Sequence, residues 1–287
     1  MTIILELGGV IINLKSEREL PVSSIMMPFI HEKSAVTDLC IQVTWEWENA
    51  RHPVTMPVGE DLLQQYYKEG RWIYCESKGG KAPVTCTCYN EDFSQIQCAV
   101  NEKPFLEPPK TLERIIQLLP MRAIFVHFKT LFLHSAQVTL NGKGILFSAP
   151  SGTGKTTQAK LWKKYMGAEI VCSDRTLIHR NNGYWRTYGY PMDGSEPVCS
   201  GAVNRLGCIV FLKQGKENKV EKLRPAKAAS LLMTQAVIDC WDAKAQQDTM
   251  ELLLEILKDI PVYQLICTPD RRAVSLLADK LEKEGVI

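Results

Sequence analysis

A glycine-rich loop at residues 149–157, which reads Ala-Pro-Ser-Gly-Thr-Gly-Lys-Thr-Thr, constrains the fold of this chain more than any other segment. The loop follows an apolar run at 144–148 and precedes a segment of helix-forming composition at 158–165. This order of strand, glycine loop and helix is the context that a phosphate-binding loop requires. Glycines let successive backbone N–H groups surround a phosphate, and the helix N-terminus adds the positive end of its dipole. We therefore predict a nucleotide-binding loop of the P-loop (Walker A) type.

Each residue of the loop has an expected role. Lys155 would reach the terminal phosphates, and the Thr156 hydroxyl would contact Mg²⁺. The loop departs from the pattern G-x-x-x-x-G-K-[ST] at its first position, where Ala149 replaces glycine. The alternative is a polar surface turn that happens to precede a helix. The predicted cofactor-binding residues are Ser151, Gly152, Thr153, Gly154, Lys155, Thr156 and Thr157.

Two further residues are expected beside the loop. Strand-like runs at 131–140 and 144–148 flank Asn-Gly, a strong hairpin signal, so His134 would lie on a strand next to the loop strand. A predicted strand from 169 ends on Asp174. A carboxylate there can hold Mg²⁺ or accept a proton from an attacking hydroxyl. We predict Asp174, His134 and Lys155 as catalytic residues and Thr156 with Asp174 as metal ligands. A structural histidine and a turn aspartate are the alternatives.

The remaining sequence divides at a proline-rich linker, 102–110. Residues 1–101 read as a strand-rich domain of meandering antiparallel strands with one face buried, plus a short helix at 60–67. Residues 111–287 would form the nucleotide-binding domain, beginning with a helix capped by Thr111. The later part of this domain is expected to contain a hairpin formed by 177–180 and 184–188, and strands at 205–212 and 261–267. It is also expected to contain helices at 225–240, 243–258 and 270–281. Arg205 is a candidate charge-stabilising arginine, with a solvated strand end as the alternative.

Composition narrows the class of protein. Residues 1–120 contain 11 Lys+Arg and 16 Asp+Glu, a net charge of −5. The chain has 34 Lys+Arg and 32 Asp+Glu in all, so residues 121–287 contain 23 and 16, a net charge of +7. The positive charge of residues 121–287, which include the glycine loop, suits the binding of a nucleotide. The basic residues are too dispersed to form a nucleic-acid surface. The ten cysteines are scattered and no leader is recognisable, which favours a cytoplasmic protein. Cys86 and Cys88 are read as two cysteines on one strand face rather than half of a metal site. No apolar run is long enough for a membrane helix.

The features from His134 onward resemble the HPr kinase/phosphoenolpyruvate carboxykinase-like group of P-loop proteins. The run 151–157 looks much like the carboxykinase loop, and 185–194 and 261–265 are similar to HPr-kinase-related bacterial kinases. The resemblance implies that His134 matches an active-site histidine and that Asp174 matches the second acid of an Asp-Asp pair. Ser173 stands where the first acid is expected, so either Asp174 does both jobs or catalysis is weakened. The HPr-recognition signature is not recognisable, and size excludes a full carboxykinase.

Taken together, these patterns predict an α/β protein with a P-loop kinase core of the HPr kinase/carboxykinase type and a strand-rich N-terminal domain. The expected activity is transfer of the γ-phosphate of ATP, with Mg²⁺, to a hydroxyl, serine being favoured, on a protein, peptide or small molecule. The alternatives are a non-catalytic ATP sensor, a kinase of a peptide-modification cassette and an enzyme that uses pyrophosphate. No nucleic-acid or membrane partner is expected, and a homo-oligomer is compatible with the resemblance.

Overall fold

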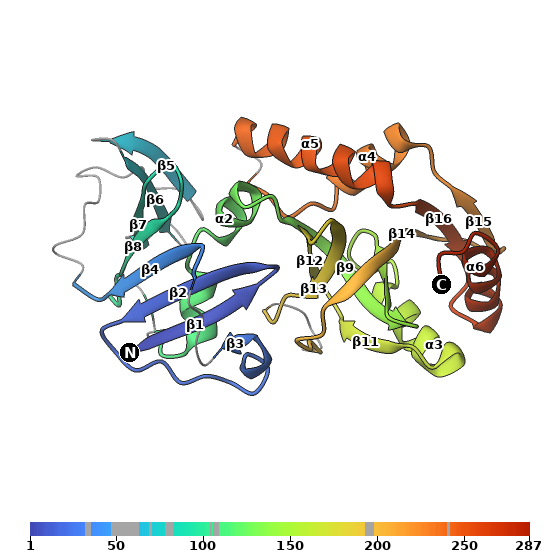
Figure 1. The fold of residues 1–287 in the computed structure, drawn as a ribbon, viewed down its shortest axis with the longest axis horizontal. Coiled ribbons are helices and arrows are strands. Elements are labelled where there is room, and N and C mark those ends of the chain that lie inside the picture. The colour runs from blue at the N-terminus through green and yellow to red at the C-terminus, as the bar shows by residue number, and fades with distance from the viewer. Residues whose placement is uncertain are drawn as a thin grey trace. The chain divides into compact units, whose positions relative to one another are not determined.

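The computed structural model describes residues 1–31, 36–46, 63–68, 71–77, 83–103, 105, 109–192, 198–239 and 242–287. Of residues 63–68, 71–77 and 83, only the backbone is described. The chain divides into two compact units, Met1–His127 and Phe128–Ile287. Each unit contains a mixed sheet, and the protein is a mixed α/β protein (Figure 1).

The first unit is built on an eight-stranded sheet of order β3-β1-β2-β4-β8-β7-β6-β5. Neighbouring strands are antiparallel except for the pairs β2–β4 and β4–β8, which are parallel. The strands are β1 (Thr2–Leu7), β2 (Val10–Ser16), β3 (Ile30–His31), β4 (Leu39–Thr44), β5 (Leu63–Lys68), β6 (Arg71–Ser77), β7 (Pro83–Tyr89) and β8 (Gln95–Val100).

Part of the predicted strand pattern of this unit is wrong. The antiparallel meander is confirmed for β6 to β8, but β2 and β4 join the sheet through parallel pairs that local sequence does not reveal. The predicted helix at 60–67 is wrong where it is described, because 63–68 form β5 and pair along their length with β6. Residues 60–62 lie outside the described residues. Adjacent tyrosines suit a strand, and the pairing with β6 overrides the weak helical pattern.

Two short helices, α1 (Leu112–Gln117) and α2 (Met121–His127), complete the first unit. The predicted cap is confirmed: Thr111 Oγ1 accepts a hydrogen bond from the Arg114 N–H. The Leu112 N–H donates to the Pro21 carbonyl at 3.1 Å, and α1 buries Leu112 against this unit. We expected 111–127 to belong with the later part of the chain, but these contacts form within the first unit.

The second unit contains the glycine loop and a second mixed sheet. Its order is β10-β9-β12-β13-β14-β16-β15, with β11 also paired to β9. Because β10 pairs with both β9 and β14, the strands β10, β9, β12, β13 and β14 close into a ring. The strands are β9 (Leu131–Leu140), β10 (Lys143–Ser148), β11 (Glu169–Cys172), β12 (Arg175–Asn181), β13 (Tyr184–Gly189), β14 (Asn204–Gln214), β15 (Lys219–Lys222) and β16 (Val262–Cys267).

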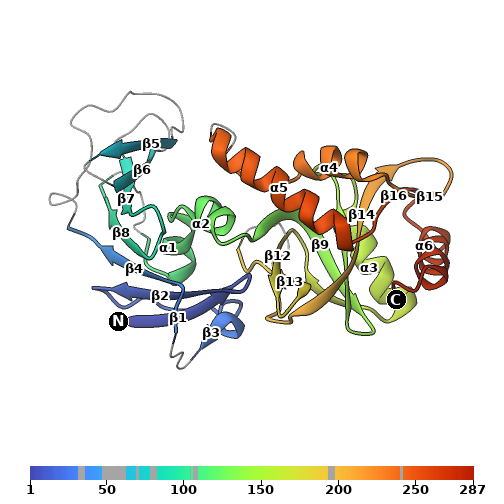
Figure 2. The ribbon, with the colours of Figure 1, turned by 45° about the horizontal axis from the view of Figure 1, so that its top comes forward.

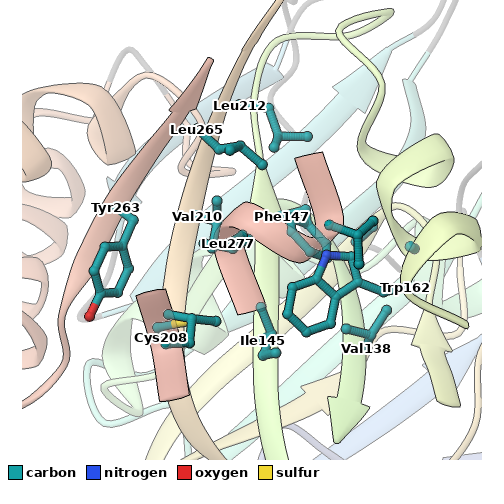
Figure 3. Close-up of a cluster of buried hydrophobic side chains, with 14 of the residues drawn as sticks. Val138, Ile145, Phe147, Trp162, Cys208, Val210, Leu212, Tyr263, Leu265 and Leu277 are labelled. Carbon is teal, nitrogen blue, oxygen red and sulfur yellow. The ribbon is translucent and has the colours of Figure 1, made fainter. Parts of the chain in front are cut away.

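Two hydrophobic cores flank this sheet. The helices α3 (Lys155–Met166) and α6 (Arg271–Lys283) cover one core, whereas α4 (Pro225–Met233) and α5 (Ala243–Asp259) cover the other; Figure 2 shows α4 beside α5. In the first core the ring of Trp162 on α3 lies 5.9 Å from that of Phe147 on β10 (Figure 3). This contact fixes α3 against the strand that precedes the glycine loop.

Local turn signals proved reliable in this unit. Both predicted hairpins form, with Asn141 and Gly142 at φ of 52° and 73° and Asn182 and Gly183 at 50° and 80°. Positive φ at both central positions is typical of a type I′ turn, which Asn-Gly favours. Gly167 ends α3 in the left-handed conformation, with φ of 68°, which is typical of glycine at the end of a helix.

One predicted helix of the second unit is too long. The sequence predicts a helix over 225–240, but α4 ends at Met233. The next residues pair instead with β9: the Val237 N–H donates to the Phe132 carbonyl at 2.8 Å, and the Gln235 carbonyl accepts from the His134 N–H at 2.9 Å. Pairing at the edge of β9 therefore overrides the apolar periodicity.

Candidate active site

The glycine loop joins β10 to α3, as expected from the order of its elements. Gly152 and Gly154 have φ of 75° and 115°, backbone conformations that glycine adopts without strain. Gly154 is the N-cap of α3 and provides no side-chain cap. The first N–H groups of α3 therefore have no capping side chain, and such a helix end attracts anions.

Gln214, at the end of β14, lies against this loop. Its Nε2 atom donates to the carbonyls of Gly152 and Thr153, both at 3.4 Å. Ser151 is exposed at the turn, and Thr156 and Thr157 lie in the first turn of α3. No local pattern could have pointed to Gln214, because it lies about sixty positions further along the chain.

Lys155 begins α3 and is buried, with 6% of its surface exposed. Its Nζ atom donates to the Ala149 carbonyl at 2.9 Å and to the Pro150 carbonyl at 3.4 Å. Burial lowers the pKa of this ammonium, and the nearby charge of Asp174 opposes that effect. A buried cation that is held mainly by carbonyl oxygens fits a bound anion at this position.

The His134 and Asp174 side chains meet across the sheet. The Nε2 atom of His134, on β9, lies 3.1 Å from Oδ1 of Asp174, which follows β11. The backbone register brings them together: Arg175 lies opposite His134 in the β9–β12 pairing, and the Ser135 N–H donates to the Asp174 carbonyl at 2.9 Å. The hydrogen bond from His134 is the largest influence on Asp174 and lowers the pKa of its carboxyl group.

Arg175 is a further charged residue in this cluster, and the sequence analysis did not single it out. Its Nε atom lies 3.6 Å from Oδ2 of Asp174, and its guanidinium lies over the Phe132 ring, 5.7 Å from the centroid. The charges of Arg175 and Lys155 both add to the lowering of the Asp174 pKa. Asp174 is thus an ionised carboxylate near the positive charges of Arg175 and Lys155.

Ser173 occupies the position where a first acid was expected. Its side chain is buried, with 7% of the residue exposed, and its carbonyl accepts a hydrogen bond from Thr156 Oγ1 at 3.4 Å. The Thr156 hydroxyl therefore lies beside the segment that carries Asp174. The structure brings His134, Lys155, Thr156 and Asp174 into one cluster.

These residues fit Mg²⁺ and a nucleotide in charge and donor type. Within the described ranges, no group of three or more His, Cys, Asp or Glu side chains offers a complete metal site. Mg²⁺ that is held together with substrate phosphates needs only one or two carboxylates. Asp174 and the Thr156 hydroxyl are the ligands that the cluster offers.

Arg205, the candidate charge-stabilising arginine, does not belong to this cluster. It lies at the start of β14, opposite Lys143 at the start of β10, whereas the glycine loop follows the last residue of β10. The structure also describes no helix that is long and apolar enough to cross a membrane.

The fold and the site together define a mixed α/β protein that presents a glycine loop, a buried lysine and a histidine–aspartate pair. The family model of the SynChlorMet cassette protein ScmC matches residues 109–272, more than half of the 287 residues. The chain therefore belongs to this family. None of the curated proteins matches the sequence.

Among solved structures, the chain is similar to the HPr(Ser) kinase/phosphatase from Coxiella burnetii. The similarity has a TM-score of 0.31 and 11% sequence identity, and it covers 54% of this chain and 89% of that chain. A likeness this distant says nothing of function.

Proposed function

We propose that this protein is an ATP- and Mg²⁺-dependent kinase that transfers the γ-phosphate to a hydroxyl group. One observation carries the proposal: the glycine loop with its buried Lys155 lies in the same cluster as the 3.1 Å contact between His134 and Asp174. An anion site beside an ionised carboxylate has the components that phosphoryl transfer needs, because the protein's main tasks there are positioning and charge neutralisation.

Each residue has a defined task in this proposal. Lys155 and the free N–H groups at the start of α3 hold the phosphates, and Thr156 and Asp174 hold the metal. Mg²⁺, when bound, supplies positive charge to the transferring group. Asp174 orients the acceptor hydroxyl and accepts its proton, and His134 fixes the carboxylate through its hydrogen bond. Arg175 adds a positive charge beside the same carboxylate.

The name of the family supports one form of the proposal. It describes a cassette protein, which favours the alternative in which the acceptor is a peptide that cassette enzymes modify. A serine hydroxyl is the acceptor group we favour.

A second candidate function is supported by Ser173. A buried serine replaces the expected first acid, so the cluster contains one carboxylate where two were expected. One carboxylate suits binding of Mg·ATP without turnover. In this candidate function the protein is an ATP sensor.

The experiment measures transfer of label from γ-labelled Mg·ATP to species in the soluble extract of the source cell. Wild type is compared with Lys155→Ala, with Asp174→Asn and with Lys163→Ala, which removes an exposed lysine from the same helix. A labelled species that requires Lys155 and Asp174 but not Lys163 supports the kinase. Binding of ATP without transfer, from either ATP or pyrophosphate, supports the sensor. Absence of ATP binding contradicts both.

A further inference from the structure

A second site lies at the opposite end of β10 from the glycine loop. A pocket of about 610 Å³ is lined by the starts of β10 and β14, the β12–β13 turn, the C-terminal end of α5 and residues 284–286 after α6. Lys143 begins β10, and the glycine loop follows its last residue, so the two sites are about 15–20 Å apart along the strand. The candidate kinase residues do not line this pocket.

The pocket carries positive charge that the chain leaves unbalanced. Lys143, Arg205 and Lys258 line it, and within the described residues none of them has a carboxylate at ion-pair distance. The two acids of the lining, Asp259 and Glu284, are already engaged.

The contacts of these acids show why they do not balance the three cations. Asp259 accepts the Trp185 indole N–H at 3.0 Å and lies 3.8 Å from the Arg180 guanidinium. Glu284 accepts the Tyr263 hydroxyl at 2.6 Å and pairs with Lys280 at 2.7 Å and with Lys222 at 3.6 Å. The charge that remains for a ligand is therefore positive.

The sheet places three cations in one row. Lys143 on β10 lies opposite Arg205 on β14, and Arg205 lies opposite Arg186 on β13. Neighbouring strands are about 4.8 Å apart, so the row spans about 10 Å of backbone. Like charges directly opposite each other destabilise a sheet. Lys143 and Arg205 line the pocket, whereas Arg186 does not, so an anion bound there would reduce the repulsion between Lys143 and Arg205.

Arg205 is held in place for such a ligand. Its guanidinium lies over the Tyr184 ring, 4.2 Å from the centroid, and Tyr184 is itself 48% exposed at the rim of the pocket. A guanidinium that stacks on a ring keeps its N–H groups for other partners. Its planar fork matches the oxygens of a phosphate in a two-bond contact.

We propose that this pocket binds a small anion with two or more phosphate groups, as a site separate from the glycine loop. Lys143, Arg205 and Lys258 provide the charge, and a volume of about 610 Å³ accommodates a small ligand. Di- or triphosphates and phosphate esters are the chemical class that fits.

The experiment is isothermal titration calorimetry with tripolyphosphate at physiological salt and without Mg²⁺. The titrations are carried out on the Lys155→Ala variant, in which the glycine-loop site is removed. We expect binding to persist in this background. Addition of Arg205→Ala or Lys143→Ala should weaken the remaining binding by about tenfold to a hundredfold, the usual effect of losing a charged hydrogen bond.

Two controls make the result specific. Lys216→Ala removes an exposed positive charge outside the pocket lining and should leave the affinity unchanged. Arg205→Lys keeps the charge but loses the planar fork and should give an intermediate affinity. If Arg205→Ala is misfolded by circular dichroism, Lys258→Ala replaces it.

Three outcomes would overturn the proposal. Loss of all binding in Lys155→Ala alone would place the anion only at the glycine loop. Equal weakening by Lys216→Ala would mean non-specific charge attraction. Binding of citrate as tight as that of tripolyphosphate would overturn the phosphate specificity. None of these outcomes depends on kinase activity, so the pocket is tested independently of the proposed function.

Discussion

The Nε2 atom of His134 lies 3.1 Å from Oδ1 of Asp174, although forty residues separate them in the chain. Residues on both sides fix this contact through the backbone. The His134 carbonyl accepts the Ser148 hydroxyl at 3.0 Å, and the Asp174 carbonyl accepts the Ser135 N–H. The pair is therefore held by the last residue of β10 and by the register of β9, immediately before the glycine loop begins.

Replacement of Lys155 should abolish nucleotide binding without destabilising the folded protein. Lys155→Met removes a buried ammonium that carbonyl oxygens hold. Mg·ATP binding measured by calorimetry should fall below detection. The midpoint of thermal unfolding should stay the same or rise, because a buried cation is costly to desolvate. Lys163→Met on the exposed side of α3 is the control, and unchanged ATP affinity in Lys155→Met would contradict the loop assignment.

Coupling between His134 and Asp174 is measurable with a double-mutant cycle. We expect His134→Ala and Asp174→Asn each to reduce phosphate transfer strongly. Their combination should cost less than the sum, with an interaction of about 0.5–3 kcal/mol because the side chains are in direct contact. Transfer rates at saturating ATP give the energies. Fully additive effects would show that the two residues act separately.

The same contact predicts how stability depends on pH. The hydrogen bond from His134 and the charges of His134, Arg175 and Lys155 lower the folded-state pKa of Asp174 below its ordinary value of 3.8. The unfolded chain lacks these contacts, so the ionised carboxylate stabilises the folded state above pH 3.8, and this contribution is lost as pH falls through the lowered value. Urea unfolding of wild type and Asp174→Asn at pH 7 and at pH 3 should show a smaller difference at pH 3. An equal difference at both pH values would contradict the prediction.

Restoration of an acid at position 173 tests the choice between kinase and sensor. Ser173→Asp places a second carboxylate next to Asp174. If the wild type is a kinase that lacks its preferred base, transfer should rise by about tenfold or more, within the usual contribution of a general base. If the wild type only binds ATP, the variant should gain transfer that the wild type lacks. Ser173→Asn adds similar volume without charge and is the control for a larger side chain at this buried position. Equal transfer rates in the Asp and Asn variants would show that the acid has no role.

Truncation of Trp162 should loosen the helix that carries the loop. Trp162 is fully buried against Phe147, so Trp162→Ala should reduce the free energy of unfolding by about 3–5 kcal/mol. Leu254→Ala, at a side chain that is 45% exposed on α5, should change it far less. Chemical denaturation monitored by circular dichroism measures both. A small effect of Trp162→Ala would show that α3 is held by other contacts.

Features that depend on neighbouring residues could be predicted from the sequence. The Asn-Gly turns, the Thr111 cap, the Gly167 helix end and the order of strand, glycine loop and helix all follow from backbone conformations that a few adjacent residues dictate. These signals also defined Lys155 and Thr156 as the candidates at the start of α3. Their predicted chemistry still awaits the experiments above.

Features that depend on distant pairing were decided only by the tertiary structure. Parallel pairing joins β2 to β4 and β4 to β8, β5 replaces a predicted helix, and α4 ends early because 235–237 bond to β9. Register also brings Arg175 to Asp174 and aligns Arg205 with Lys143 in a separate pocket. Strand partners lie tens of residues apart, and hydrogen bonds between their backbones carry no residue-specific signal. The sequence by itself therefore determined the local parts of the site, and the sheet decided which of them meet.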